Sequence, residues 1–242
     1  MNISSDLIEA KINSYATRCF LETADRDYIH ARLAYRSALL PQFRWSALHA
    51  LEKYGKCILL LNRINGHNIG HKVLKSIERV KLAGRFEIPL SDQTVEFIKR
   101  LESSAADRYL ASSWYSLSGD LERLDRATVE IRRYCQIFDY EFESKSGERI
   151  NLFQANLARV TQKEGQPLQN FPLFNGWLER IMSKQDHPAR EGLLWNNTFF
   201  GSEQNEPYCE YSESQNSPFD LHPDVIEELD KWIYIPKERK RS

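Results

Sequence analysis

The hydrophobic pattern of residues 43–61 constrains the fold of this chain more than any other feature. At about 100° per residue, its apolar side chains fall on one broad arc of an α-helix. Pro41 is tolerated in a first turn, where its missing N–H needs no partner, so we expect the helix to begin near Gln42. Gly55 is a poor helix former, which favours close approach of another helix there. A second arc is polar and holds His49, Glu52, Lys53 and Lys56.

Apolar residues at three- and four-residue spacing predict further helices before and after this stretch. A residue before proline is pushed out of the α region, so Leu40 ends the helix that precedes Pro41. The helices on either side of this short joint should form an antiparallel hairpin. Ser91 is the expected N-cap of a later helix. The predicted helices are 6–23, 24–40, 72–82, 92–101, 109–117 and 121–138.

The pattern changes after Phe138, where Asn, Gln, Gly and Pro interrupt scattered apolar residues. Residues 195–200 are the only segment for which we consider a strand, and 203–217 is expected to be a polar loop. The short helices predicted in this part are 151–161, 174–182 and 223–232. We therefore predict an all-α fold, with a helical bundle in residues 1–140 and a mixed, loop-rich extension in 141–242.

The composition of the 242-residue chain is that of an ordinary globular protein, with 41% hydrophobic and 28% charged residues. A formal net charge of -1 argues against a globally basic nucleic-acid binder, although a local basic patch is compatible with it. No apolar run approaches the roughly 20 residues that span a bilayer, and the N-terminus lacks a signal-peptide pattern. The four cysteines are far apart in the sequence. We therefore expect a cytoplasmic protein with reduced thiols and no membrane partner.

Three segments, taken in order, give the chain a family likeness. They are Ala-Asp-Arg-Asp-Tyr-Ile-His-Ala-Arg (24–32), Ala-Leu-His-Ala-Leu-Glu-Lys-Tyr-Gly-Lys (47–56) and Gly-His-Asn-Ile (66–69). Residues 1–140 resemble the HEPN superfamily (higher eukaryotes and prokaryotes nucleotide-binding). The resemblance implies an all-α, up-and-down HEPN-like helical bundle and a homodimer formed through a face of the central helices. Gly55 departs from the larger apolar residue expected in the family signature.

Many HEPN proteins are metal-independent ribonucleases with an R-x(4–6)-H motif in the final bundle helix. An arginine there can stabilise phosphate charge while a histidine moves the proton of the RNA 2′-hydroxyl. Residues 119–138 contain arginines but no histidine, so the motif is absent from its expected place. Arg44 and His49 have the spacing, but about 140° of helical rotation separates them. Both could reach one phosphate only if Arg44 lies in a frayed first turn or across a dimer axis. Arg180 and His187 also match the spacing, outside the HEPN-like part.

His67 and His71 are four residues apart, a spacing that can chelate a transition metal on a helix. No third ligand is identifiable, and Gly66 and Gly70 favour a loop in which His67 caps a helix or bonds the backbone. We therefore predict no metal site and no cofactor, and keep His67 as a binding residue.

Two charged surfaces have both a functional and a simpler interpretation. The polar arc with Glu52, Lys53 and Lys56 can face a phosphate or a second subunit, or it is a solvated face supported by the i,i+4 pair Glu52–Lys56. The arginine-rich helix 121–138 can bind RNA, but its interspersed acids favour a solvated outer face. The basic tail 237–241 has the same ambiguity.

The favoured function hypothesis is a nucleotide- or RNA-binding or accessory module. The resemblance alone suggests a prokaryotic stress, toxin–antitoxin or phage-defence setting. The first alternative is a metal-independent ribonuclease with Arg44 and His49 in a composite site. The second is a protein-interaction scaffold, in which residues 141–242 dock a partner protein.

Overall fold

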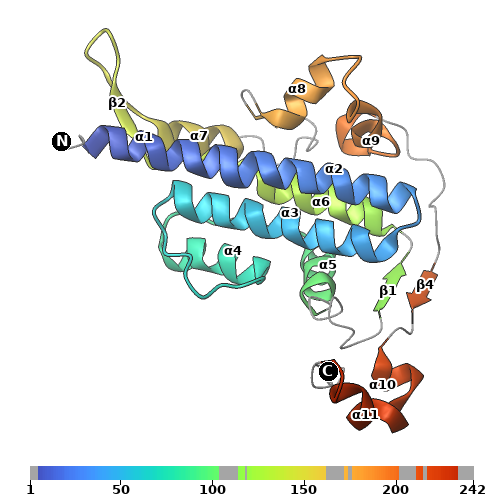
Figure 1. The fold of residues 1–242 in the computed structure, drawn as a ribbon. Coiled ribbons are helices and arrows are strands. Elements are labelled where there is room, and N and C mark those ends of the chain that lie inside the picture. The colour runs from blue at the N-terminus through green and yellow to red at the C-terminus, as the bar shows by residue number, and fades with distance from the viewer. Residues whose placement is uncertain are drawn as a thin grey trace.

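The computed structural model describes residues 5–103, 114–117, 119–161, 172–173, 176–201, 211–214 and 217–233. Its first feature is one uninterrupted helical run that forms a long edge of the molecule (Figure 1). The run consists of α1 (Ser5–Tyr15), the π-helix η1 (Ala16–Leu21) and α2 (Glu22–Arg36). The sequence predicts two separate helices here. A π-turn holds more residues per turn and so shifts the phase of the apolar stripe, which is why one helix resembles two in the sequence.

The predicted helical hairpin is confirmed. α3 (Leu40–Leu61) follows α2 after a tight joint in which Ala38 has a φ of 61° and Leu39 N–H donates to the carbonyl of Ala34 at 2.8 Å. α3 begins two residues before the expected Gln42, with Pro41 in its first turn. The centre of the bundle is the α2–α3 pair, and its largest fully buried side chains include those of Tyr28 and Tyr54. The predicted all-α helical bundle is thus confirmed.

The remaining bundle helices also agree with the predictions. The Ser91 hydroxyl accepts a hydrogen bond from Thr94 N–H at 3.3 Å, so it caps its helix as expected. The apolar face of that helix packs into the core with Phe97, Ile98 and Leu101. The helices are α4 (Val73–Leu82), α5 (Asp92–Ser103) and α6 (Asp120–Arg132), and the 3₁₀-helix η3 (Arg133–Gln136) continues α6.

Part of the C-terminal region packs on this bundle. Leu178, Ile181 and Leu193 are buried in the same hydrophobic cluster as the bundle helices. The predicted strand at 195–200 is wrong, because residues 198–200 form a 3₁₀-helix, and the Asn197 side chain accepts a hydrogen bond from the Phe199 N–H of that helix. The elements here are the antiparallel pair β2 (Glu141–Glu143) and β3 (Arg149–Asn151), α7 (Leu152–Thr161), α8 (Trp177–Ser183), α9 (Arg190–Leu194) and η5 (Thr198–Phe200).

A second antiparallel pair joins β1 (Trp114–Leu117) to β4 (Tyr211–Ser214). The predictions of a helix at 109–117 and of a loop at 203–217 are wrong in these strands; residues 109–113 and 203–210 lie outside the described part. Each strand is short and its partner is about a hundred residues away, so local periodicity could not reveal the pairing. The chain then forms α10 (Pro218–Leu221), η6 (Pro223–Val225) and α11 (Ile226–Asp230), which are near the C-terminal end in Figure 1.

Two buried ion pairs connect α2 to α6 in a reciprocal arrangement. Arg32 of α2 forms a salt bridge with Asp125 of α6, and Arg132 of α6 forms one with Asp25 of α2. Each helix thus carries an aspartate and, seven residues later, an arginine, a spacing that returns to nearly the same helix face. Because the helices are antiparallel, the two Asp-x6-Arg segments are mutually complementary.

A tyrosine hydroxyl and groups from the C-terminal region of the chain also form hydrogen bonds with these ion pairs. Tyr28 donates to Asp125 at 2.7 Å, and Arg32 Nε donates to the carbonyl of Gly192 at 3.0 Å. Tyr54 donates to Asp25 at 2.7 Å. Burial, followed by the adjacent aspartate, raises the pKa of both tyrosines well above the usual value, so their hydroxyls stay protonated donors. The network fixes the register of α2 against α6 and anchors α9.

The prediction that the arginines of residues 121–138 face solvent is wrong for Arg132, at the end of α6, and for Arg133 in η3, which are 4% and 8% exposed. Arg132 also bonds both carboxylate oxygens of Glu179 on α8, at 2.7 and 2.8 Å. An apolar-versus-polar pattern treats every arginine as an outer residue, whereas here carboxylates from two other helices make burial of Arg132 acceptable. Arg123 and Arg126 are half-buried.

Gly55 of α3 packs closely against Ser76 of α4. A Cβ atom built on Gly55 would lie 2.9 Å from the Ser76 Cβ, which cannot rotate away. Gly55→Ala should therefore lower the free energy of unfolding by about 1–3 kcal/mol, despite the roughly 1 kcal/mol gain in helix propensity. Urea unfolding monitored by circular dichroism measures the change. Ser76→Gly in the same chain should restore most of it, and a Gly55→Ala protein more stable than the parent would contradict the close packing.

Candidate functional site

Glu52, on the polar arc of α3, organises the first part of the candidate site. Its side chain is only 9% exposed, and it accepts hydrogen bonds from Lys56 Nζ and, at 2.7 Å, from His71 Nδ1. Burial raises the pKa of this carboxyl, but the hydrogen bonds from Lys56 and His71 more than offset burial and leave the pKa below its usual value. Glu52 therefore remains a carboxylate near neutral pH. Of the two interpretations of the polar arc, the solvated face does not hold for Glu52, because this residue is buried and bonded by His71 from the loop before α4.

The Glu52 carboxylate fixes the tautomer of His71. A carboxylate only accepts hydrogen bonds, so Nδ1 of His71 must carry the proton, and Nε2 of the neutral ring is then a base. The His49 ring lies one helical turn before Glu52, with its centroid 6.3 Å from that of His71. Two imidazoles, a carboxylate and the Lys56 ammonium thus meet in one place, from α3 and the end of the α3–α4 loop.

Lys53 lies beside this group but is held by another helix. Its Nζ forms a salt bridge with Asp27 of α2. On the same seam, His30 of α2 and Ser46 of α3 share a hydrogen bond of 2.7 Å. Lys53 therefore connects the two helices of the hairpin, and its charge is largely neutralised by Asp27.

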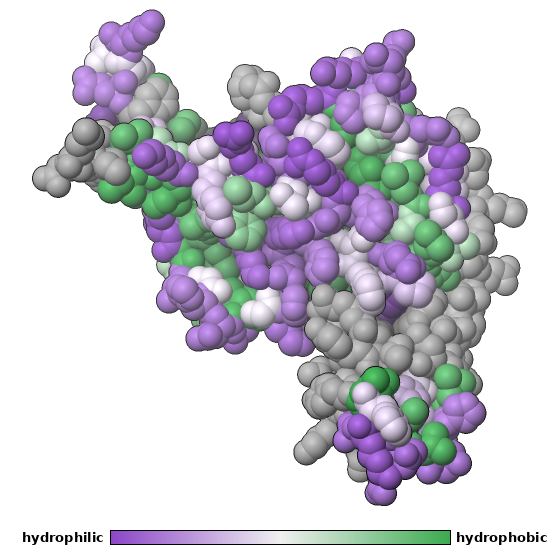
Figure 2. Space-filling model, in the orientation of Figure 1, coloured by the Kyte–Doolittle hydropathy of each residue, from purple (hydrophilic) through white to green (hydrophobic). Residues whose placement is uncertain are grey.

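A surface pocket continues the site from Lys56 toward the N-terminal helix. Its volume is about 290 Å³, and Lys56 and His67 both line it. Tyr15 and Phe20, which pack edge to face with ring centroids 5.7 Å apart, provide an aromatic wall. Figure 2 shows hydrophobic residues gathered at this end of the bundle, where α1 lies near the end of α3. The remaining lining residues are Leu59, Leu60, Ile64 and Gly66.

The structure thus brings together Glu52, Lys56 and His67 from the sequence predictions, with His49 nearby. Tyr15 and Phe20 were not predicted. Five residues apart, they would lie about 140° apart on a regular α-helix, and only the π-helix η1 lets both rings reach one pocket. A π-helix has no sequence signature strong enough to reveal this.

Arg44 lies elsewhere. It is 7% exposed and donates from Nη1 to the carbonyl of Tyr115 in β1, whereas His49 faces His71. Within one chain, the two residues of this candidate catalytic pair contact different elements. A composite Arg44–His49 site across a dimer stays a prediction.

The loop that carries His67 is held by hydrogen bonds between side chains and its backbone. Asn65 Oδ1 accepts from His67 N–H at 2.8 Å, and Arg79 donates to the carbonyls of Asn65 and His67. His67 and His71 therefore lie in a turn rather than on one helix face. Across the described ranges, no group of three or more His, Cys, Asp or Glu side chains could hold a metal ion, and no helix is long and apolar enough to cross a membrane.

Arg180 and His187, the other pair with the ribonuclease spacing, line a separate pocket beside α8. The described cysteines Cys19, Cys57 and Cys135 are free thiols. No protein-family model, curated protein or solved structure matches the chain significantly.

Proposed function

We propose that the chain binds single-stranded RNA on the face formed by α1, η1 and the second half of α3. The observation that carries the proposal is the pocket in which the aromatic wall of Tyr15 and Phe20 meets Lys56 and His67. Unpaired bases stack on aromatic side chains, and cationic side chains beside them contact the phosphates. The likeness of residues 1–140 to HEPN proteins supports the same ligand class.

The geometry suggests how a strand would lie. A base would enter the pocket against Tyr15, which is 53% exposed and accessible without rearrangement. The adjoining phosphate would lie near Lys56, and the strand would continue along α3 toward His71 and His49. Lys56 is neutralised in part by Glu52, so we expect modest affinity with a shallow dependence on salt.

Tyr15→Ala should weaken the binding of a single-stranded RNA oligonucleotide by about 1–3 kcal/mol, or roughly 5- to 150-fold, because a stacked base loses its platform. Fluorescence anisotropy at low and moderate salt measures the affinity. Lys56→Gln should weaken binding and reduce its dependence on salt.

Trp232→Ala and Lys81→Gln are matched controls, since both residues are exposed and lie outside this face. Both should bind RNA like the parent. A parent protein that fails to bind RNA at low salt, or a Tyr15→Ala variant with parental affinity, would refute the proposed surface.

The arrangement of His49, His71 and Glu52 favours metal-independent RNA cleavage as a second function. His71, oriented by Glu52, would take the proton of a 2′-hydroxyl, and the 2′-oxygen would attack the adjacent phosphorus. His49 would give a proton to the departing 5′-oxygen, which leaves a 2′,3′-cyclic phosphate. Neither a metal nor water enters this step.

The other expectations from the sequence and the family resemblance remain proposals. They comprise a homodimer, a partner protein docked on residues 141–242, a cytoplasmic location, and a role in prokaryotic stress, toxin–antitoxin or phage-defence systems. Exposed apolar side chains such as Leu7, Ile8 and Leu39 are compatible with a protein partner.

A further inference from the structure

A second, strongly basic pocket lies between α2 and α8. Its volume is about 280 Å³, and Arg26, Arg180 and Lys184 line it against a single acid, Glu22. Glu22 pairs with Arg180 at 2.9 Å and with Arg26 at 3.6 Å. Three cationic groups against one carboxylate leave the pocket with a charge near +2, with His187 counted as neutral. Such a pocket attracts an anion.

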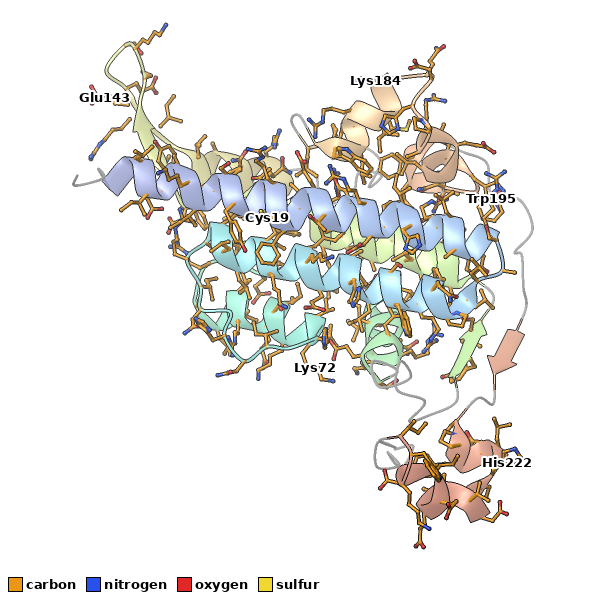
Figure 3. The ribbon with its side chains drawn as sticks, in the orientation of Figure 1. Cys19, Lys72, Glu143, Lys184, Trp195 and His222 are labelled. Atoms are coloured by element: carbon orange, nitrogen blue, oxygen red, sulfur yellow. The ribbon has the colours of Figure 1, made fainter. Side chains whose placement is uncertain are left out.

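His187 and Lys184 supply hydrogen-bond donors to this pocket. His187 Nδ1 accepts from the N–H of Ala189 at 3.1 Å, so the neutral ring carries its proton on Nε2 and can donate to an anion. Lys184 is at the C-terminal end of α8, as Figure 3 shows. Arg26 and Arg180 offer planar guanidinium groups, which suit phosphate oxygens.

An apolar pocket of about 410 Å³ shares two wall residues, Glu22 and Trp177, with the basic pocket. The Arg26 guanidinium lies 4.9 Å from the centroid of the Trp177 ring, and His187 packs edge-on to the same ring. Arg159 and Asn156 of α7 also line the apolar pocket. The π-helix η1 contributes Thr17 and Leu21 to it.

A residue that lines the apolar pocket, Gln136, carries a buried acceptor without a donor. Gln136 is 6% exposed, and its Nε2 donates to the carbonyl of Arg133 at 2.8 Å. That hydrogen bond fixes the orientation of the amide, because Oε1 could not donate there. Among the described residues, Oε1 has no hydrogen-bond partner. A buried acceptor without a partner is costly. Oε1 is closed to solvent, so a ligand N–H would reach it only after the Gln136 side chain shifts toward the pocket, and the new hydrogen bond would favour that shift.

We propose that the two pockets together bind a nucleoside phosphate. The planar base would occupy the apolar pocket, with a ring or exocyclic N–H donating to Gln136 Oε1. The phosphate would occupy the basic pocket, contacted by Arg26, Arg180, Lys184 and His187. A volume of about 410 Å³ is within the usual range for small-molecule pockets. Neither pocket shares a lining residue with the pocket of Tyr15, Phe20, Lys56 and His67, so the two proposals are tested independently.

Isothermal titration calorimetry of the full chain with the four common nucleoside 5′-monophosphates tests the proposal. Adenosine without phosphate and inorganic phosphate without a base are the two partial ligands. At least one nucleotide should bind roughly tenfold or more tightly than either, because each partial ligand fills only one pocket. Phosphate that binds as tightly as every nucleotide would overturn the assignment of the base pocket.

Two variants separate the halves of the site. Arg180→Gln combined with Lys184→Gln should weaken nucleotide binding roughly tenfold or more while leaving nucleoside binding unchanged, since both side chains lie at the surface. Gln136→Met should weaken the binding of both nucleotide and nucleoside, and its melting temperature reports whether the fold survives.

Lys145→Gln, in the turn between β2 and β3, is a control that should bind nucleotide like the parent. The proposal is wrong if none of the four nucleotides binds, or if the Arg180→Gln and Lys184→Gln double variant keeps full affinity.

Discussion

Arg132→Met should lower the free energy of unfolding by about 3–5 kcal/mol, because it leaves a buried aspartate without its cation. Asp25 is fully buried. After the change it would keep the hydrogen bond from the Tyr54 hydroxyl and lose its contact with the Arg132 guanidinium. Burial by itself would lower the pKa of the Arg132 guanidinium, but Asp25 and Glu179 raise it well above the usual value. The arginine is therefore a permanent cation of this network. Urea unfolding followed by circular dichroism measures the loss.

Arg126→Met is the matched control on the same helix. Arg126 is half-exposed and pairs with Glu122 at i,i+4, so its loss should cost no more than about 1 kcal/mol. Asp25→Asn added to Arg132→Met should recover part of the stability, because it removes the uncompensated charge. An Arg132→Met protein within 1 kcal/mol of the parent would contradict the buried-network interpretation.

His71→Ala should reduce metal-independent cleavage of single-stranded RNA by roughly 10²–10⁴-fold, the usual contribution of a general base. His49→Ala should cause a loss of similar size, since the leaving oxygen would lose its acid. The measurement is the rate of cleavage of an end-labelled RNA at enzyme excess in EDTA, with a 2′,3′-cyclic phosphate as the product. Glu52→Gln should cause a smaller loss, because the amide can still orient His71 but no longer requires a proton on Nδ1.

His222→Ala is the control for these histidine variants, because His222 is exposed in the C-terminal segment that Figure 3 shows below the bundle. It should cleave RNA at the parental rate. If the parent protein does not cleave RNA at high excess, the ribonuclease function is wrong, while RNA binding is still tested separately by Tyr15→Ala. If Arg44→Gln abolishes cleavage in a dimer and His71→Ala does not, the composite Arg44–His49 site is the better explanation.

The helical bundle could be predicted because its signals are local. The apolar residues of 43–61 repeat with the period of a helix, Pro41 is in a first turn, and Ser91 caps the helix that follows it. Gly55 correctly indicated a close helix contact, which Ser76 makes. The short strands β1 and β4 could not be predicted, because each depends on a partner about a hundred residues away.

The candidate site was predictable only in part. Glu52, Lys56 and His67 were selected from the polar arc and the glycine-rich loop, and the structure gathers them around one carboxylate and one pocket. His71 was considered only as a metal ligand, because its contact with Glu52 depends on how the loop folds back. The paired Asp-x6-Arg segments were visible in the sequence, but their meaning depended on knowing that α2 and α6 are antiparallel neighbours.

The sequence by itself determined the helical content, the α2–α3 hairpin and the two faces of α3, because residues three and four apart decide which side of a helix is apolar. The tertiary structure decided which polar groups are buried and which side chains share a site. Arg132, which has the sequence pattern of a surface residue, is buried because carboxylates of α2 and α8 surround it. The polar arc of residues 43–61 is a candidate site for the same reason: α1, η1 and the α3–α4 loop bring aromatic rings and a second histidine to it, and no local pattern encodes those contacts.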